Sequence, residues 1–188
     1  MAFEHYIYAD GKQLRCGYTT GTCAALAASG AVQKLLTGVW PETVSLRTPK
    51  GLTVEVPLEH CRMQGDTAQC SVREDGGDDV DKTTGALIQA NVSLSDTPGI
   101  RIRGGQGVGR VTKPGLDQPV GEAAINRVPR QMIREAVEAA CRTADYDGGA
   151  EVTISVPEGE AIAQKTFNPQ MGIVGGISIL GTSGIVEP

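Results

Sequence analysis

Apolar residues recur at helical spacing in two segments of the chain. Small apolar residues repeat on one face between Thr22 and Leu36, which predicts a helix with Thr22 as its N-cap and Gly38 as its terminator. A second helix is predicted to begin near Pro129, because proline favours the first helical position. Its buried stripe consists of Met132, Ile133, Ala136, Val137, Ala140 and Cys141.

Short segments with strand-like composition fill most of the remaining chain. Six of them form three pairs, each pair around a turn with glycine, and successive hairpins predict antiparallel sheet. The pairs are Val44–Arg47 with Leu52–Val56, Glu59–Met63 with Ala68–Val72, and Ala86–Leu94 with Ile100–Arg103. Later come an alternating strand at Glu151–Val156, a short helix near Glu158–Lys165 and an apolar strand at Ile173–Leu180. We therefore predict a single α+β domain with two main helices.

Composition narrows the class of protein. The 188 residues include 25 glycines but only 4% aromatic residues, and no apolar run approaches the roughly 20 residues that span a bilayer. The N-terminus shows no basic segment followed by an apolar run, and the five cysteines form no CxxC pair. We expect reduced thiols, a cytoplasmic protein without membrane contact, and no bound metal, since His60, Cys61 and Cys70 match no zinc spacing.

The charge is unevenly distributed. The formal net charge of −5 argues against nucleic-acid binding. Seven basic and two acidic residues lie between Arg101 and Arg134, whereas the rest of the chain has ten basic and twenty acidic residues. A basic segment in an acidic protein favours an anionic small molecule as ligand, although solvated arginines on exposed faces are the simpler alternative.

The loop before the first predicted helix is a candidate anion site. Backbone N–H groups and the helix dipole at a helix N-terminus attract carboxylates or phosphates. The candidate binding residues are Thr19, Thr20, Gly21 and Thr22. No lysine follows in the Walker pattern, and ordinary helix capping is the alternative.

A second candidate is the glycine-rich stretch between Arg103 and Leu116. We interpret it as a flexible basic loop that folds over an anionic ligand, with a mobile surface hairpin as the alternative. It contains no GxGxxG pattern, which argues against dinucleotide binding. The candidate binding residues here are Arg103, Gly105, Gly107, Arg110 and Lys113.

Two further segments carry chemistry. Carboxylates gather on the glycine turn between Asp75 and Asp81, where they would hold a hard cation, supply a base or form a solvated turn. Asn168 precedes Pro169 in a defined turn and offers an amide to ligand carboxylates. Two histidines, His5 and His60, do not provide a Ser/His/Asp triad.

These segments, in this order, resemble the CbiD family of cobalt-precorrin-5B C(1)-methyltransferases. The resemblance covers nearly the whole chain, and its last block is long and specific. The matching stretches are GYTTGTCA (17–24), GDD (77–79), RGGQGVGRVTKPGL (103–116), PVGEAAINRVPR (119–130) and TFNPQMGIVGGISILGTSGIVEP (166–188). Cys16 stands where threonine is usual, and Ala123 and Arg127 replace prolines.

The resemblance implies a fold, a reaction and a substrate. The fold is like a circularly permuted second domain of ribosomal protein S5, and the chain corresponds to an N-terminal substrate-binding half, residues 1–188. A C-terminal domain that binds S-adenosylmethionine would follow it. The substrate is an anionic cobalt corrinoid, methylated at C1 and contacted by Arg103, Arg110, Lys113, Arg130 and the Thr19–Thr22 loop. Asp78 and Asp79 are the candidates for assisting deprotonation.

Other readings of the sequence stay open. A non-catalytic anion-binding or assembly domain would use its glycine-rich segments for contacts in a homo-oligomer. A phosphoryl-transfer enzyme would use the N-terminus of the first helix for phosphate, but it lacks the Walker lysine.

Overall fold

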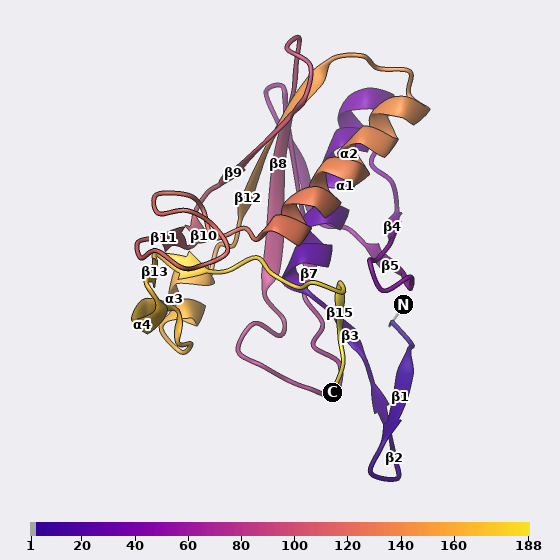
Figure 1. Cartoon of the computed structure of the whole chain (residues 1–188). Helices are drawn as coiled ribbons and strands as arrows, with labels where there is room; N and C mark the ends of the chain where they lie inside the picture. Colours follow the sequence, from indigo (N-terminus) through magenta and orange to yellow (C-terminus); the bar gives the residue numbers. More distant parts are fainter. Residues whose placement is uncertain (1–2) are drawn as a thin grey trace.

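A five-stranded sheet forms the centre of the computed structural model, which describes residues 3–188 (Figure 1). Its strands lie in the order β6-β7-β8-β12-β9. Their bounds are β6 Glu59–Gln64, β7 Thr67–Arg73, β8 Leu87–Ser95, β9 Ile100–Gly104 and β12 Gly149–Ser155. All neighbours are antiparallel except β9 and β12. The predicted α+β class with mostly antiparallel sheet is confirmed.

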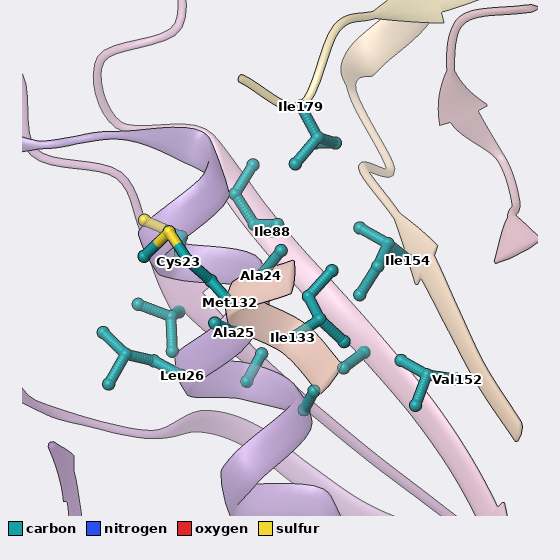
Figure 2. Packing of buried hydrophobic residues seen from close by; sticks show 14 of the residues in the cluster. Cys23, Ala24, Ala25, Leu26, Ile88, Met132, Ile133, Val152, Ile154 and Ile179 are labelled. Carbon is teal, nitrogen blue, oxygen red and sulfur yellow. The ribbon is translucent and has the colours of Figure 1, made fainter. Parts of the chain in front are cut away.

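Two long helices, α1 Thr20–Thr37 and α2 Arg127–Thr143, pack side by side against one face of this sheet (Figure 1). The buried side chains of α1 are small, so the helix can approach the strands closely. Cys23, Ala24 and Ala25 among them are fully buried. Figure 2 shows these residues in the same buried cluster as Ile133 of α2 and Ile154 of β12. Both main helices were predicted, and the predicted short helix near Glu158–Lys165 is present as α3 Gly159–Ala163; a further short helix, α4 Asn168–Met171, was not predicted.

The ends of both helices differ from the predicted ends. The N-cap of α1 is Thr19, whose hydroxyl oxygen accepts the Thr22 N–H at 3.2 Å, so the predicted cap at Thr22 is wrong. Gly38 ends the helix in the left-handed conformation (φ +81°), as predicted. The second helix begins at Arg127 rather than at Pro129, with Asn126 in the N-cap position.

The predicted hairpin of β8 with β9 is wrong. The turn at Pro98-Gly99 reverses the chain, but β12 lies between the two strands and pairs with both. β12 is antiparallel to β8 and parallel to β9, and the chain between β9 and β12 includes α2. The other two predicted hairpins, β4–β5 and β6–β7, are present.

Short strand pairs surround the sheet. They are β1 Tyr6–Ala9 with β2 Lys12–Arg15, β4 Thr43–Arg47 with β5 Thr53–Pro57, β3 Gly17–Tyr18 with β15 Ile185–Val186, β10 Gly107–Val108 with β14 Gly176–Ile177, and β11 Arg110–Val111 with β13 Ile173–Val174. The predicted strand at Ile173–Leu180 is therefore two short strands, separated by Gly175 at φ +91°. Within residues 3–188, no helix is both long and apolar enough to cross a membrane.

Candidate functional site

Segments far apart in the sequence meet at a small pocket of about 170 Å³ at the N-terminal end of α1. One wall comes from the start of α1, a second from the chain after β7, and a third from α4 and the segment after β14. The lining residues are Thr19, Thr20, Glu74, Asp81, Thr83, Thr166, Asn168, Ile177, Ser178, Leu180 and Val186. The pocket thus joins three of the segments selected from the sequence.

The threonines before α1 are hydrogen-bonded within the chain. Thr20 Oγ1 accepts the Leu180 N–H at 3.0 Å, and Thr22 Oγ1 donates to the Gly184 carbonyl at 2.8 Å. The Gly21 N–H donates to the Leu180 carbonyl at 3.0 Å. The segment 180–184 therefore covers much of the helix N-terminus, and anion binding by Thr19–Thr22 stays a prediction.

The acidic turn is held against the first hairpin. The Arg15 guanidinium contacts both carboxylate oxygens of Asp75, at 2.8 and 3.0 Å. Burial alone would raise the pKa of Asp75, but hydrogen bonds from Arg15 and from the Gly77 N–H bring it below its ordinary value. Asp78 accepts the Arg15 backbone N–H at 2.6 Å and returns its own N–H to the Arg15 carbonyl. These bonds to Arg15 hold the acidic turn in a defined position against the first hairpin.

The two candidate acids of the turn, Asp78 and Asp79, differ in their contacts with the rest of the fold. Asp78→Ala removes the acceptor of the Arg15 N–H and is expected to lower the free energy of unfolding by about 1–2 kcal/mol. The exposed Asp79 carboxylate makes no hydrogen bond or ion pair within residues 3–188, so Asp79→Ala should change it by less than about 0.5 kcal/mol. Urea unfolding of both variants measures this difference, and equal losses would contradict it.

Glu74 is a functional candidate that the sequence analysis missed. It follows β7 directly, lines the pocket and is only 3% exposed. Its Oε2 atom is buried without a hydrogen-bond partner. Burial, and then repulsion from Asp81 and Asp75, raises the pKa of Glu74 to about 8. One sequence signal identifies it: Ala68, Cys70 and Val72 point to the core at every second position, and residue 74 continues that series.

The first half of the glycine-rich stretch after β9, residues 104–109, is tightly packed, which contradicts the expectation of a flexible loop there. Gly107, at φ +76°, pairs with Gly176 in the β10–β14 ladder, and a Cβ atom on Gly107 would overlap the Val156 carbonyl. A Cβ atom on Gly105 would overlap the Ser155 side chain. These glycines permit close approach of backbones, so Gly105 and Gly107 stay ligand candidates only through their backbone groups.

The predicted basic residues lie on different elements. Arg103 projects from the sheet face opposite the helices, 3.5 Å from Glu151, since its neighbour Ile102 packs on the core. Arg110 is exposed and donates to the Gly121 carbonyl, and Lys113 is exposed and donates to the Gln170 carbonyl. Arg130 is half-buried, which lowers the pKa of its guanidinium, and it donates to the Ile125 and Ala123 carbonyls.

Asn168 connects the pocket with the glycine-rich stretch. At the start of α4, its amide nitrogen donates over 3.4 Å to the Gly176 carbonyl and to Ser178 Oγ. These are long hydrogen bonds, which leave the amide free to turn toward a ligand.

The cysteine and histidine side chains do not gather. Cys70 donates to the Ala27 carbonyl, and burial raises its pKa to about 12, while Cys61 is exposed. No cluster of three or more His, Cys, Asp or Glu side chains suited to a metal ion is found among residues 3–188.

A larger cavity, of about 860 Å³, lies between the two long helices and β4. Leu36, Leu46, Met132 and Ala136 are among its lining residues, and Arg47 and Glu135 are its charged groups. None of the binding residues selected from the sequence lines this cavity. Because the charges of Arg47 and Glu135 cancel, the cavity has no net charge that would attract an anionic ligand.

The molecule is thus a mixed α+β domain with a small polar pocket at the end of its first helix. The CbiD family model matches residues 7–188, and the chain belongs to the CbiD family.

Curated relatives and a solved structure agree with this assignment. The chain is 56% identical over 177 residues to a protein of Geobacillus kaustophilus named cobalt-precorrin-5B C(1)-methyltransferase, covering 94% of this chain and 48% of that protein. A protein of the same name from Ruminiclostridium cellulolyticum is 51% identical, covering 98% of this chain and 48% of its own length. The chain spans about half the length of these relatives.

The crystal structure of the cobalamin biosynthesis protein CbiD from Archaeoglobus fulgidus superimposes with a TM-score of 0.74 at 38% identity. The match covers 97% of this chain and 58% of that one.

Proposed function

We propose that this chain is the substrate-binding half of an S-adenosylmethionine-dependent methyltransferase that methylates C1 of cobalt-precorrin-5B in cobalamin biosynthesis. The observation that carries the proposal is the 56% identity, over 94% of the chain, to a protein named for that reaction. The anaerobic pathway and a cytoplasmic location belong to the same proposal, and the five free cysteines are in keeping with that location.

The distribution of charge supports an anionic corrinoid as substrate. Arg103, Arg110 and Lys113 are exposed, and their contacts within the chain are with carbonyl oxygens or with one carboxylate at 3.5 Å. Guanidinium groups form strong paired hydrogen bonds with carboxylates, such as the acetate and propionate groups of a tetrapyrrole-derived ring. On this proposal, the domain binds and orients the ring, and alignment with the donor supplies most of the catalysis.

The methyl donor is proposed to bind mainly to residues beyond this chain, because the relatives named as methyltransferases are about twice as long. The pocket at α1, at about 170 Å³, is smaller than the roughly 300–1,000 Å³ of typical small-molecule sites. It therefore suits an edge or a side chain of a ligand rather than a complete nucleoside-containing donor. We also propose that the fold is like a circularly permuted second domain of ribosomal protein S5. Formation of a homo-oligomer is a further part of the proposal.

Methyl transfer is the reaction that tests the proposal. Cobalt-precorrin-5B and S-adenosylmethionine are incubated with the longer protein that contains this domain and, separately, with the 188-residue chain. Mass spectrometry should find the corrinoid gaining one methyl group with the longer protein and none with the chain alone. Methylation by the chain alone would show that the donor site lies within these residues, and no methylation by the longer protein would reject the proposed activity.

Removal of two exposed cations should weaken corrinoid binding. The double variant Arg103→Ala/Arg110→Ala is expected to raise the dissociation constant for cobalt-precorrin-5B by about tenfold, because charge-assisted hydrogen bonds contribute about 1.5–3 kcal/mol each before solvent screening. The change in the visible spectrum of the corrinoid measures the affinity. The double variant Lys12→Ala/Arg142→Ala removes the same charge elsewhere and should leave it unchanged. Equal affinity of both variants at moderate salt would argue against a role for these arginines.

A further inference from the structure

The pocket at the start of α1 is lined by two carboxyl groups and by no cationic side chain. Glu74 and Asp81 supply carboxyl groups to it, and no lysine, arginine or histidine is among its lining residues. Asp81 Oδ1 accepts hydrogen bonds from the backbone and side chains of Thr83 and Thr84, which fix this exposed carboxylate in its own turn. The Glu74 carboxyl receives no hydrogen bond within residues 3–188, and its Oε2 is buried. A buried carboxyl without a partner is costly, and this one opens onto a cavity.

The position of Glu74 is fixed by its backbone. Its N–H donates to the Ala86 carbonyl at 2.9 Å, and its carbonyl accepts the Gly85 N–H at 2.9 Å. These bonds direct the side chain to the same side as the core residues of β7. The backbone pairing therefore holds the carboxyl in the wall of the pocket, where the residue is only 3% exposed.

The charged groups around Glu74 do not neutralise it. Asp75 and Asp81 lie in its own loop and repel its charged form, and Cys23 of α1 and Tyr18 of β3 are buried neutral groups beside it. The nearby cation, Arg15 of β2, is paired with Asp75 through two hydrogen bonds. Residues 3–188 supply no counter-charge in contact with Glu74, so its partner is a proton or a donor group of a ligand.

We propose that Glu74 accepts the proton that the substrate ring releases when it is methylated. This inference rests on the proposed function. In the reaction, a carbon–carbon bond forms to the donor methyl group, and the carbon–sulfur bond breaks with its electron pair passing to sulfur. The methyl group brings the positive charge of the donor to the ring. The ring becomes neutral again when one of its own C–H or N–H bonds breaks, leaves its electron pair in the ring and passes the proton to the Glu74 carboxylate.

The environment of Glu74 suits this role. A general base is most effective when its pKa lies near the working pH, and burial brings the pKa of Glu74 to about 8. Thr20, Asn168 and Ser178 line the same pocket and offer groups that can hold the edge of the ring while the proton moves. Asp78 and Asp79, the candidates from the sequence, do not line the pocket.

Glu74→Gln in the longer protein tests the proposal, because glutamine keeps the shape and hydrogen bonding of a neutral carboxyl but cannot take up a proton. We expect kcat for methyl transfer to fall by at least about 100-fold, while the dissociation constant for cobalt-precorrin-5B changes by less than about threefold. The kcat of the unmodified protein should rise with pH toward 8, and the variant should lose this rise. Glu74→Asp should recover part of the activity.

Two outcomes would overturn the assignment. Full kcat in Glu74→Gln, with the unmodified protein active, would show that Glu74 takes up no proton, whatever its effect on binding. A loss of kcat with an unchanged pH profile would show a structural role. Absence of methyl transfer by the unmodified protein would instead reject the proposed function. Glu55→Gln, an exposed carboxyl on β5, is the matched control and should keep full activity.

Discussion

Glu74→Gln is expected to stabilise the domain by about 4 kcal/mol at pH 8 and above. The pKa of Glu74 is raised from 4.5 to about 8 in the folded chain, so the folded state holds a proton that the unfolded state has lost between these values. The stability of the unmodified chain should therefore fall as the pH rises through this window. Glutamine cannot ionise, so the variant avoids the loss.

Urea unfolding of the 188-residue chain and its variant, from pH 4 to pH 9, measures this difference. The two stability curves should be nearly parallel below pH 4.5 and diverge above it. Asp75, whose pKa is lowered, titrates in both proteins and cancels in the comparison. Glu55→Gln should follow the unmodified curve, since Glu55 is exposed. A constant difference across the range would contradict a buried, proton-binding Glu74.

Gly107→Ala is expected to destabilise the domain by at least about 3 kcal/mol. A Cβ atom there would overlap the backbone carbonyl of Val156, and φ of +76° is strained for any residue with a side chain. Backbone atoms cannot turn away as a flexible side chain can. The pairing of β10 with β14, in which Gly107 lies opposite Gly176, must therefore break.

Gly115→Ala distinguishes backbone strain from overlap of the added Cβ atom with a neighbouring backbone. Gly115 has φ of +93° in the same glycine-rich stretch, but no atom lies within 4 Å of its added Cβ. Its substitution should cost only the backbone strain, about 1 kcal/mol. Thermal unfolding of both variants checks the difference, and equal losses would mean that the close approach at Gly107 is not essential.

The helices and two hairpins could be predicted because their signals are local. The apolar spacing in 22–36 marks α1, and Gly38 ends it. The cap was misplaced because Thr19, Thr20 and Thr22 have similar chemistry, and only the fold decides which hydroxyl accepts a helical N–H. The pairing of β8 with β12 could not be predicted, since a glycine turn reports a chain reversal but not which strand will lie between the two arms.

The residues of the pocket could likewise be predicted only in part from the sequence. The threonine loop, the acidic turn and Asn168 were each identified as chemically unusual, and the fold brings all three to one place. Glu74 was missed because it belongs to no motif, although the alternation of β7 places it on the buried side. Flexibility is predicted for the stretch between Arg103 and Leu116, but Gly107 is required there because another backbone occupies the space of a side chain, as at Gly17.

Titration of the 188-residue chain with cobalt-precorrin-5B, followed by the fluorescence of the single Trp40, tests the claim of a substrate-binding domain most directly. The corrinoid absorbs where tryptophan emits, so a bound ring quenches the signal. The account predicts saturable quenching with one corrinoid per chain, and a matching shift in the visible spectrum of the corrinoid. Fluorescence that falls only through absorption of light by free corrinoid, without saturation, would contradict it.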